Sequence, residues 1–265
     1  MQPLLSLQDI SYSYHNLKGE TPALSNISFQ VSSGEFLAVV GPSGCGKSTL
    51  LSIIAGLLKP EQGNLFYKGR CLADCGSKDT VTIGYMLQRD HLFEWRTIYQ
   101  NVTLGLELNH TLTDTNRDYV LKLLTDYGLY AFKDKKPSEL SGGMRQRAAL
   151  IRTMAIHPNL LLLDEPFSAL DSQTRLDVSA DIAQIIRQTN KTAVLITHDL
   201  SEAITLADRV LVLSKRPAVI KCEMPIHYEI SRQDPMAIRN TPEYQQYFNH
   251  LWEVLTNGSS VIQSA

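Results

Sequence analysis

The sequence has few cysteines, no marked excess of charge of either sign and no long apolar run. The four cysteines are irregularly spaced, and the pair at positions 71 and 75 lacks the second pair that a zinc site needs, so we expect reduced thiols. The formal net charge of −2 lacks the basic excess of a nucleic-acid-binding protein. We therefore expect no nucleic acid among the partners.

The chain also lacks the signals that direct a protein into or across a membrane. Its longest apolar run, around residues 50 to 58, is broken by Ser52 and Gly56 and falls short of the ~20 residues that span a bilayer. The N-terminus, MQPLLSLQDI, has neither the basic start nor the apolar stretch of a secretion signal. With 265 residues, 43% of them hydrophobic, the chain is long enough to bury a full core. These features indicate an enzyme that stays in the cytosol.

The most informative segment reads GPSGCGKST and follows an apolar stretch at residues 36–40. Its glycine and lysine spacing is that of a P-loop, and a helix-like run at residues 48–59 follows it. Strand, glycine loop and helix in that order direct backbone N–H groups and the positive end of a helix dipole at one spot. This context disfavours the alternative, in which the glycines only make a tight turn. We expect Lys47 to reach the β- and γ-phosphates and Ser48 to ligate magnesium. The predicted nucleotide-binding loop consists of Gly41, Pro42, Ser43, Gly44, Cys45, Gly46, Lys47, Ser48 and Thr49.

Predicted strands and helices alternate along the chain. Apolar residues at helical spacing predict helices at 119–129 and 141–155, and Ser141 can cap the second. This order predicts an α/β fold with a mainly parallel sheet, interrupted by one helical insertion. The strands are predicted at residues 7–14, 24–31, 36–40, 64–68, 81–86, 160–163 and 193–196.

Two carboxylates follow a predicted strand of four leucines. Asp164 and Glu165 would lie at the carboxyl end of that strand, which is the edge of an α/β sheet where ligands bind. There Asp164 would hold magnesium and Glu165 would orient or deprotonate the attacking water. Adjacent carboxylates more often cap a helix or face solvent, but the P-loop favours the functional interpretation. His198 follows another buried strand and precedes Asp199, which can cap the next helix.

Several motifs in a fixed order resemble the ATP-binding subunit of an ABC transporter, over about residues 5 to 215. The run LSGGM at residues 140–144 resembles the family signature, and SALD at residues 168–171 resembles the loop after the Walker B strand. Gln88 resembles the glutamine that joins the two lobes, and His198 resembles the switch histidine that contacts the γ-phosphate.

The resemblance also assigns an adenine-stacking aromatic residue near the N-terminus. Tyr14 matches it best, at the end of its predicted strand, although Tyr12 lies on the same strand face and competes for the role. The resemblance implies catalytic roles for Lys47, Gln88, Glu165 and His198. It implies magnesium ligation by Ser48, Gln88 and Asp164.

In this family two subunits pack head to tail, and each ATP lies between the P-loop of one subunit and the signature of the other. Here Ser141, Gly142 and Gly143 offer a hydroxyl and backbone N–H groups at a helix start, which suits an anion. We therefore expect a symmetric dimer with two complete sites, which ATP closes and hydrolysis releases.

The implied fold is a P-loop NTPase core with a mainly parallel sheet, an N-terminal antiparallel β subdomain and an inserted α-helical subdomain. We expect the ATP-binding core at residues 1–88 and 158–215, the helical signature subdomain at 89–157, and a C-terminal extension at 216–265. The extension should end in a helix that packs on its own chain rather than on a partner. Its apolar face would consist of Tyr244, Tyr247, Phe248, Leu251, Trp252 and Leu255.

Finer features resemble importer subunits for nitrate, sulfonates and taurine. They are Met144 with the Arg-Gln-Arg that follows it, the LFEW run at residues 92–95, and residues 214–220. Glu94 departs from that pattern, because related chains commonly carry proline there. Trp95 either docks a permease helix or packs in the helical lobe.

The resemblance also implies partners: a second ATPase subunit, integral-membrane permease subunits and, indirectly, a solute-binding protein. It implies that the chain is peripheral, on the cytoplasmic face of the inner membrane. Nitrate, sulfonates, taurine, bicarbonate and a thiamine-related pyrimidine stay open as cargo.

Two further function classes fit the sequence less well. A soluble ABC protein of translation or DNA repair usually carries paired ATPase units or long coiled coils, and this chain has one P-loop and no heptad run. A switch GTPase needs Asn-Lys-x-Asp, and the nearest match, at residues 190–193, lacks the aspartate.

Within the P-loop, Cys45 lies beside a helix start, which we expect to stabilise its thiolate. Alkylation of Cys45 should then block nucleotide binding, and ATP should protect the thiol.

Overall fold

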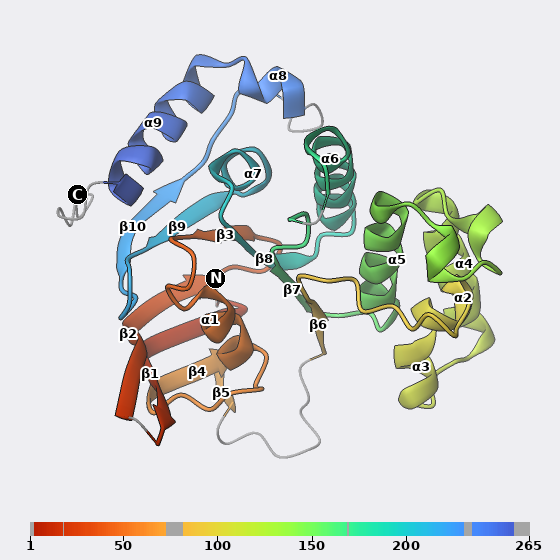
Figure 1. The fold of residues 1–265 in the computed structure, drawn as a ribbon, viewed down its shortest axis with the longest axis horizontal. Helices are drawn as coiled ribbons and strands as arrows, with labels where there is room; N and C mark the ends of the chain where they lie inside the picture. The colour runs from red at the N-terminus through yellow and green to blue at the C-terminus, as the bar shows by residue number, and fades with distance from the viewer. Residues whose placement is uncertain (1–2, 18, 73–81, 169, 231–234, 257–265) are drawn as a thin grey trace.

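Two sheets and the helices around them make up the protein (Figure 1). The computed structural model describes residues 3–17, 19–72, 82–168, 170–230 and 235–256. A four-stranded sheet has the order β2-β1-β4-β5 and is antiparallel, and a six-stranded sheet has the order β10-β9-β3-β8-β7-β6. The strands are β1 (Leu5–Asn16), β2 (Gly19–Val31), β3 (Phe36–Val40), β4 (Gln62–Tyr67), β5 (Arg70–Cys71), β6 (Ile83–Met86), β7 (Leu160–Asp164), β8 (Thr192–Thr197), β9 (Arg209–Leu213) and β10 (Ile220–Pro225).

The six-stranded sheet is mainly parallel, as predicted. Strands β9, β3, β8, β7 and β6 run in one direction, and only β10 at the edge pairs antiparallel with its neighbour β9. The predicted strand at 81–86 begins at Ile83, and its first residue, Val81, lies outside the described residues. Uninterrupted hydrophobic strands such as β3 and β7 suit this position because both faces of the sheet are covered.

Alternate residues of the central strands enter two separate hydrophobic cores. In β3, Phe36, Ala38 and Val40 face the core that contains the helices α5 (Gly142–Ala155), α6 (Ser172–Gln188), α7 (Leu200–Leu206) and α9 (Pro242–Thr256). Leu37 and Val39 face the core formed with α1 (Lys47–Ile54) and the antiparallel sheet. This alternation follows from the two-residue period of a strand, and it places α1 and the N-terminal sheet on one side of the parallel sheet (Figure 1).

Helices dominate the chain between β6 and β7. Thr97 caps α2 (Ile98–Val102) in a capping box with Gln100, α3 (Leu104–Leu108) follows, and Thr113 caps α4 (Asp114–Asp126). The helix predicted at 119–129 therefore begins earlier, at its threonine cap, and ends earlier, before Gly128 at a φ of 70°. Helix α5 (Gly142–Ala155) starts where predicted, because the Ser141 side chain accepts a hydrogen bond from the Met144 N–H.

The helix after the P-loop is shorter than the prediction of residues 48–59. Helix α1 spans Lys47–Ile54. Gly56 then takes a left-handed φ of 72°, and the N–H groups of Leu57 and Leu58 turn back to the Ser52 carbonyl. This is the usual way in which a glycine ends a helix. The prediction was wrong because it extended the apolar run through that glycine, whereas Leu57 is 67% exposed.

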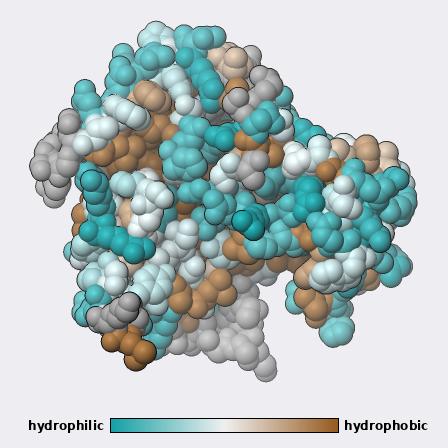
Figure 2. Space-filling model, viewed as in Figure 1, coloured by the Kyte–Doolittle hydropathy of each residue, from teal (hydrophilic) through white to brown (hydrophobic). Residues whose placement is uncertain are grey.

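The helices that follow β7 complete the helical face of the sheet. Helix α6 (Ser172–Gln188) is capped by Asp171, and α7 (Leu200–Leu206) is capped by Asp199. After β10 the chain forms α8 (Pro235–Arg239) and α9 (Pro242–Thr256), which buries Tyr244 and Leu251 against the rest of the chain. Trp252 is 55% exposed, and Figure 2 shows hydrophobic surface next to α9.

Candidate functional site

Four parallel strands end at the same edge of the sheet, and each is followed by a residue expected at the site. The neighbours in order are β3, β8, β7 and β6. The register pairs Val40 with Thr197, Ile196 with Asp164, and Leu163 with Met86. The P-loop, His198, Glu165 and Gln88 therefore leave the sheet side by side. This edge is where doubly wound α/β sheets bind their ligands.

The P-loop lysine is held by the loop itself. Lys47 is 5% exposed, and its Nζ donates to the carbonyls of Gly41 at 2.9 Å and Pro42 at 3.0 Å. Gly46 has a φ of 125°, and a Cβ there would lie 3.0 Å from the Ala23 carbonyl oxygen, so only glycine fits. The loop thus keeps a buried ammonium group and a helix N-terminus at one place, as the phosphate-binding prediction requires.

Ser48 and Asp164 lie together although 116 residues separate them in the chain. The Ser48 hydroxyl donates to Asp164 Oδ1 at 3.1 Å, and Asp164 is 8% exposed. Burial raises the pKa of the Asp164 carboxyl, and the Ser48 hydrogen bond and the Lys47 charge oppose that rise. A hydroxyl and a buried carboxylate are oxygen donors of the kind that Mg²⁺ prefers. These two residues therefore fit the predicted magnesium site, and Gln88 lies next to it, in contact with Glu165.

Glu165 lies between a histidine and a glutamine from two other strands. His198 Nδ1 lies 3.1 Å from Glu165 Oε2, and Gln88 Nε2 donates to the same oxygen at 3.3 Å. Glu165 has a left-handed φ of 44°, a backbone conformation that costs a non-glycine residue roughly 1–2 kcal/mol. The parallel sheet on either side maintains it, since the Glu165 N–H donates to the Ile196 carbonyl. Such local strain is typical of functional sites.

Tyr14 reaches the nucleotide loop from the antiparallel sheet. Its hydroxyl lies 2.9 Å from Thr49 Oγ1, and the side chain as a whole is 39% exposed. Tyr12 packs edge-on against it, with ring centroids 5.1 Å apart. The structure thus places Tyr14 in direct contact with the loop and Tyr12 behind it, which suits Tyr14 as the residue that offers a ring face.

The expectation of a thiolate at Cys45 is wrong. Cys45 is 2% exposed, and burial raises the pKa of its thiol even though the Lys47 charge acts in the opposite direction. The helix N-terminus does not compensate for this burial. The side chain belongs to the core beneath the loop, where it behaves as a small apolar residue.

The signature residues lie away from the other candidate residues. Ser141, Gly142 and Gly143 begin α5, which Figure 1 shows well apart from α1 and the P-loop. A Cβ on Gly143 would lie 2.9 Å from Thr174 Cγ2 of α6, so the two helices approach closely at this point. The chain therefore does not bring its own signature to its own P-loop. Of the SALD run that follows β7, Ala169 lies outside the described residues, whereas Ser168 Oγ accepts a hydrogen bond from Gln88.

Arginines of α5 fix the segment after Gln88, a feature that sequence reasoning missed. Arg145 binds Asp90 through Nε at 2.9 Å and Glu94 through a second nitrogen at 2.9 Å. Arg152 donates to the backbone carbonyls of Asp90 and His91. Burial alone would raise the pKa of Asp90, but the Arg145 and Leu92 hydrogen bonds and the arginine charges lower it overall. Nothing in the spacing of charges along the chain indicates these pairs.

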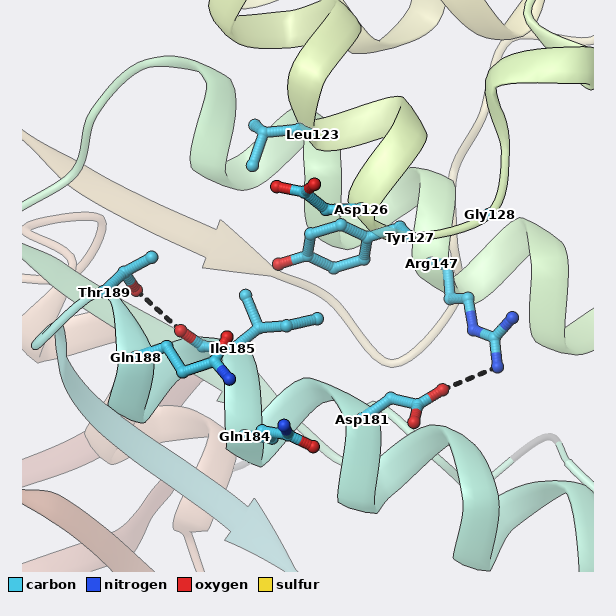
Figure 3. Close-up of a pocket in the computed structure, with 10 residues that line it drawn as sticks. All are labelled: Leu123, Asp126, Tyr127, Gly128, Arg147, Asp181, Gln184, Ile185, Gln188 and Thr189. Carbon is cyan, nitrogen blue, oxygen red and sulfur yellow. Dashed lines mark hydrogen bonds and ion pairs between the residues drawn. The ribbon is translucent and has the colours of Figure 1, made fainter. Parts of the chain in front are cut away.

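A cavity elsewhere in the molecule does not belong to this site. It has a volume of about 430 Å³ and lies between the end of α4 and α6 (Figure 3). Arg147 crosses it to Asp181 at 2.7 Å and so joins α5 to α6. Large hydrophobic side chains are also exposed in the chain after Gln88, where Trp95 is 73% exposed and Leu108 of α3 is 70% exposed. Trp95 packs against Phe93, with ring centroids 4.7 Å apart, and its exposure places it outside the core.

The sheet order, the loop after β3 and the carboxylates after β7 define a P-loop nucleoside triphosphatase. Residues 24–168 match the sequence profile described as "ABC transporter". The chain belongs to the ABC transporter family, as its ATP-binding, ATP-hydrolysing component. No helix among the described residues has the length and apolar character needed to cross a bilayer.

Relatives and solved structures agree with this assignment. The uncharacterized ABC transporter ATP-binding protein YtlC of Bacillus subtilis is 44% identical over 253 residues, which cover 96% of each chain. The nitrate import ATP-binding protein NrtD of a Synechocystis species is 37% identical over 95% of this chain and 94% of its own. The post-hydrolysis dimer of the ATP-binding cassette MJ0796, bound to ADP and Pi, superposes with a TM-score of 0.73 at 30% identity, over 84% of this chain and 99% of its own.

Proposed function

We propose that this ATPase powers an importer for a small anionic solute of the nitrate, sulfonate, taurine or bicarbonate kind, through a membrane permease. The similarity to a nitrate import protein supports the solute class. The single observation that carries the motor function is the meeting of Ser48, Asp164, Glu165 and His198 at one edge of the sheet. A transport motor needs this arrangement because the gain or loss of contacts to one phosphate must move residues that follow several strands.

Each of these residues at the edge of the parallel sheet has a distinct role in the proposed hydrolysis of ATP. Lys47 exchanges its two loop carbonyls for the β- and γ-phosphates. Ser48 and Asp164, with Gln88, hold Mg²⁺, which when bound neutralises charge that develops on the phosphates. Glu165 orients the attacking water and accepts its proton, at a position that His198 maintains through its 3.1 Å contact. Roles of this kind contribute on the order of 10²–10⁴ to the rate.

The proposed active form is a head-to-tail dimer. The distance of Ser141, Gly142 and Gly143 from the P-loop supports it, because these N–H groups then remain available for the γ-phosphate of a second copy. Tyr14 stacks on the adenine, as its exposed ring beside Thr49 permits. The dimeric ADP-bound cassette of similar fold also supports the arrangement. ATP closes the dimer, and hydrolysis opens it.

The exposed Trp95 is proposed as a contact of the permease's cytoplasmic helix. Residues 1–88 and 158–215 would form the ATP-binding part, 89–157 the signature part and 216–265 the extension. The chain would lie at the cytoplasmic face of the inner membrane, and a solute-binding protein would act through the permease. A soluble ABC ATPase is the alternative function, and the identity of the copurifying proteins separates the two.

Dimer formation tests the proposed motor. Glu165→Gln should bind ATP without hydrolysing it, so its mass by light scattering should double with ATP and Mg²⁺. Adding Ser141→Arg should keep it monomeric, since the added side chain occupies the place of the partner's phosphate. A Glu165→Gln protein that stays monomeric, alone and with its permease, contradicts the dimer.

Mass spectrometry of the proteins that copurify from detergent-solubilised membranes tests the transport function. It should find a multi-helix permease, and recovery with ribosomes or repair proteins instead contradicts transport.

A further inference from the structure

A buried carboxylate lies directly behind the switch histidine and has no part in the roles given above. Glu202 of α7 is 6% exposed, and it accepts a hydrogen bond from Thr197 Oγ1 at 2.6 Å. Thr197 Oγ1 in turn accepts the Asp199 N–H at 3.0 Å. Thr197 and Asp199 flank His198 in the chain. Glu202 thus fixes the backbone on both sides of the histidine that contacts Glu165.

Arg175 of α6 faces this carboxylate. One terminal nitrogen lies 3.7 Å from Asp199 Oδ2, and Nε lies 4.0 Å from Glu202 Oε1. The other terminal nitrogen donates to the Leu170 carbonyl at 3.0 Å. Arg175 Nε is buried and has no hydrogen-bond partner among the described residues. A buried N–H without a partner is costly, so a small approach of Glu202 to hydrogen-bond distance would be favourable.

Leu170 belongs to the segment that also carries Ser168. Ser168 Oγ donates to the Glu165 carbonyl at 3.0 Å and lies 3.4 Å from Gln88 Nε2. The guanidinium of Arg175 therefore lies between two structures that both contact Glu165: this segment on one side, and the backbone around His198 on the other.

We propose that Arg175 and Glu202 are positioning residues for ATP hydrolysis: together they hold His198 against Glu165 and link that contact to the segment that carries Ser168 and Leu170. Neither residue touches the nucleotide. They act by fixing the orientation of His198, and a movement of the segment at Leu170 changes that orientation through Arg175. The inference rests on the proposed roles of Glu165 and His198 and extends them.

The chemistry of the two side chains explains why this pair suits the task. A guanidinium can bind a backbone carbonyl and two carboxylates at once, because its donors point in several fixed directions. Lysine carries its three N–H donors on one nitrogen, so it cannot stand in for the separate Arg175 nitrogens that face the Leu170 carbonyl and the two carboxylates. At an assay pH of 8 Glu202 is charged, because this lies above its pKa of about 7, so Glu202→Gln removes the charge that faces Arg175 while it keeps an acceptor for Thr197.

Steady-state kinetics on the purified full chain test the pair. Arg175→Ala should lower kcat for ATP by roughly 10- to 100-fold while KM stays near the wild-type value, since small displacements of catalytic groups have effects of that size. Arg175→Lys should restore part of kcat. Glu202→Gln should also lower kcat, and the Arg175→Ala/Glu202→Gln double variant should be no slower than the slower single variant, because the two act through one contact.

Arg187→Ala is the matched control. Arg187 also lies on α6 and also donates to a backbone carbonyl, that of Leu206, which lies at the opposite end of α7 from Asp199. It should lower the unfolding temperature with little change in kcat. If Arg175→Ala has the same kcat as Arg187→Ala, or if the losses at Arg175 and Glu202 multiply, the proposal is wrong. His198→Ala separates failure of the positioning proposal from failure of the proposed function. If His198→Ala keeps full turnover, the proposed role of His198 is wrong. If His198→Ala loses turnover while Arg175→Ala stays active, only the positioning role of Arg175 and Glu202 is wrong.

Discussion

The guanidinium of Arg145 on the signature helix lies 2.9 Å from the carboxylate of Glu94 in the segment after Gln88. Asp90 binds the same guanidinium, so α5 and this segment are joined at two points. Glu94 is the residue at which the resemblance to importer subunits leads us to expect a proline instead. Here it is an ion-pair partner beside the exposed Trp95, and it ties the proposed permease contact to the helix that carries the signature.

Arg145→Ala should lower the free energy of unfolding by about 1–3 kcal/mol, because it leaves the Asp90 carboxylate without its hydrogen-bonding charge. Glu94→Gln should cost no more than ~1 kcal/mol, since that side chain is 52% exposed and its pair is partly screened. Urea unfolding of both variants measures the difference. Equal costs would show that Asp90 is satisfied without Arg145.

Tyr14→Ala should raise KM for ATP about tenfold or more, because stacking of a base on an aromatic ring contributes about 1–3 kcal/mol. Tyr14→Phe keeps the ring and loses only the hydrogen bond to Thr49, so its KM should remain near the wild-type value. Tyr12→Ala is the control for the neighbouring ring. A larger effect at Tyr12 than at Tyr14 would reverse the assignment.

Cys45 should react with iodoacetamide more slowly than Cys71 in the native protein. Cys45 is buried and the pKa of its thiol is raised, whereas Cys71 is partly exposed. Peptide mapping by mass spectrometry gives both rates, and the difference should disappear in urea. Modification of Cys45 should abolish nucleotide binding and ATP should slow it further, since the thiol lies beneath the phosphate loop. Fast native labelling of Cys45, or full activity after labelling, would contradict this account.

Glu202 should make stability depend on pH. Burial raises its pKa from an ordinary 4.5 to about 7, with Thr197 and Arg175 lowering it and Asp199 raising it. The folded protein therefore keeps a proton that the unfolded chain releases above about pH 4.5. This contribution to stability is complete below that pH and is lost as the pH rises through about 7. Relative to Glu202→Gln, the wild type should lose on the order of 3 kcal/mol between pH 4 and 8. A constant difference in unfolding free energy across that range would refute it.

Leu251 and Trp252 form a matched pair on α9. Leu251 is fully buried and Trp252 is 55% exposed. Leu251→Ala should cost about 2–5 kcal/mol of unfolding free energy, through lost burial and the cavity it leaves. Trp252→Ala removes a larger side chain but should cost less, since most of it already contacts solvent. Thermal unfolding of the two variants compares them directly, and a larger loss at Trp252 would mean that α9 packs on another face.

Local sequence was enough to predict most of the strands and the nucleotide loop, but not β5, β9 or β10. The spacing of Gly41, Gly46 and Lys47 and the capping serine of α5 are short-range signals, and the structure confirms the strand, loop and helix around them. Errors arose where a short-range signal competed with burial or with backbone conformation. Gly56 ended α1 before the apolar run did, and burial outweighed the helix N-terminus at Cys45.

Only the tertiary structure decided which distant residues meet. The strand order β3-β8-β7-β6 brings together residues from four parts of the chain, and no sequence spacing specifies that order. The same holds for Arg145 with Glu94, and for Arg175 with Glu202, whose partners come from different elements. A single sequence does not show which charged and hydroxyl side chains will pair. The packing of apolar faces elsewhere in the molecule determines which of them come into contact. The sequence by itself determined the chemistry of the site, and the packing of helices on the sheet determined its geometry.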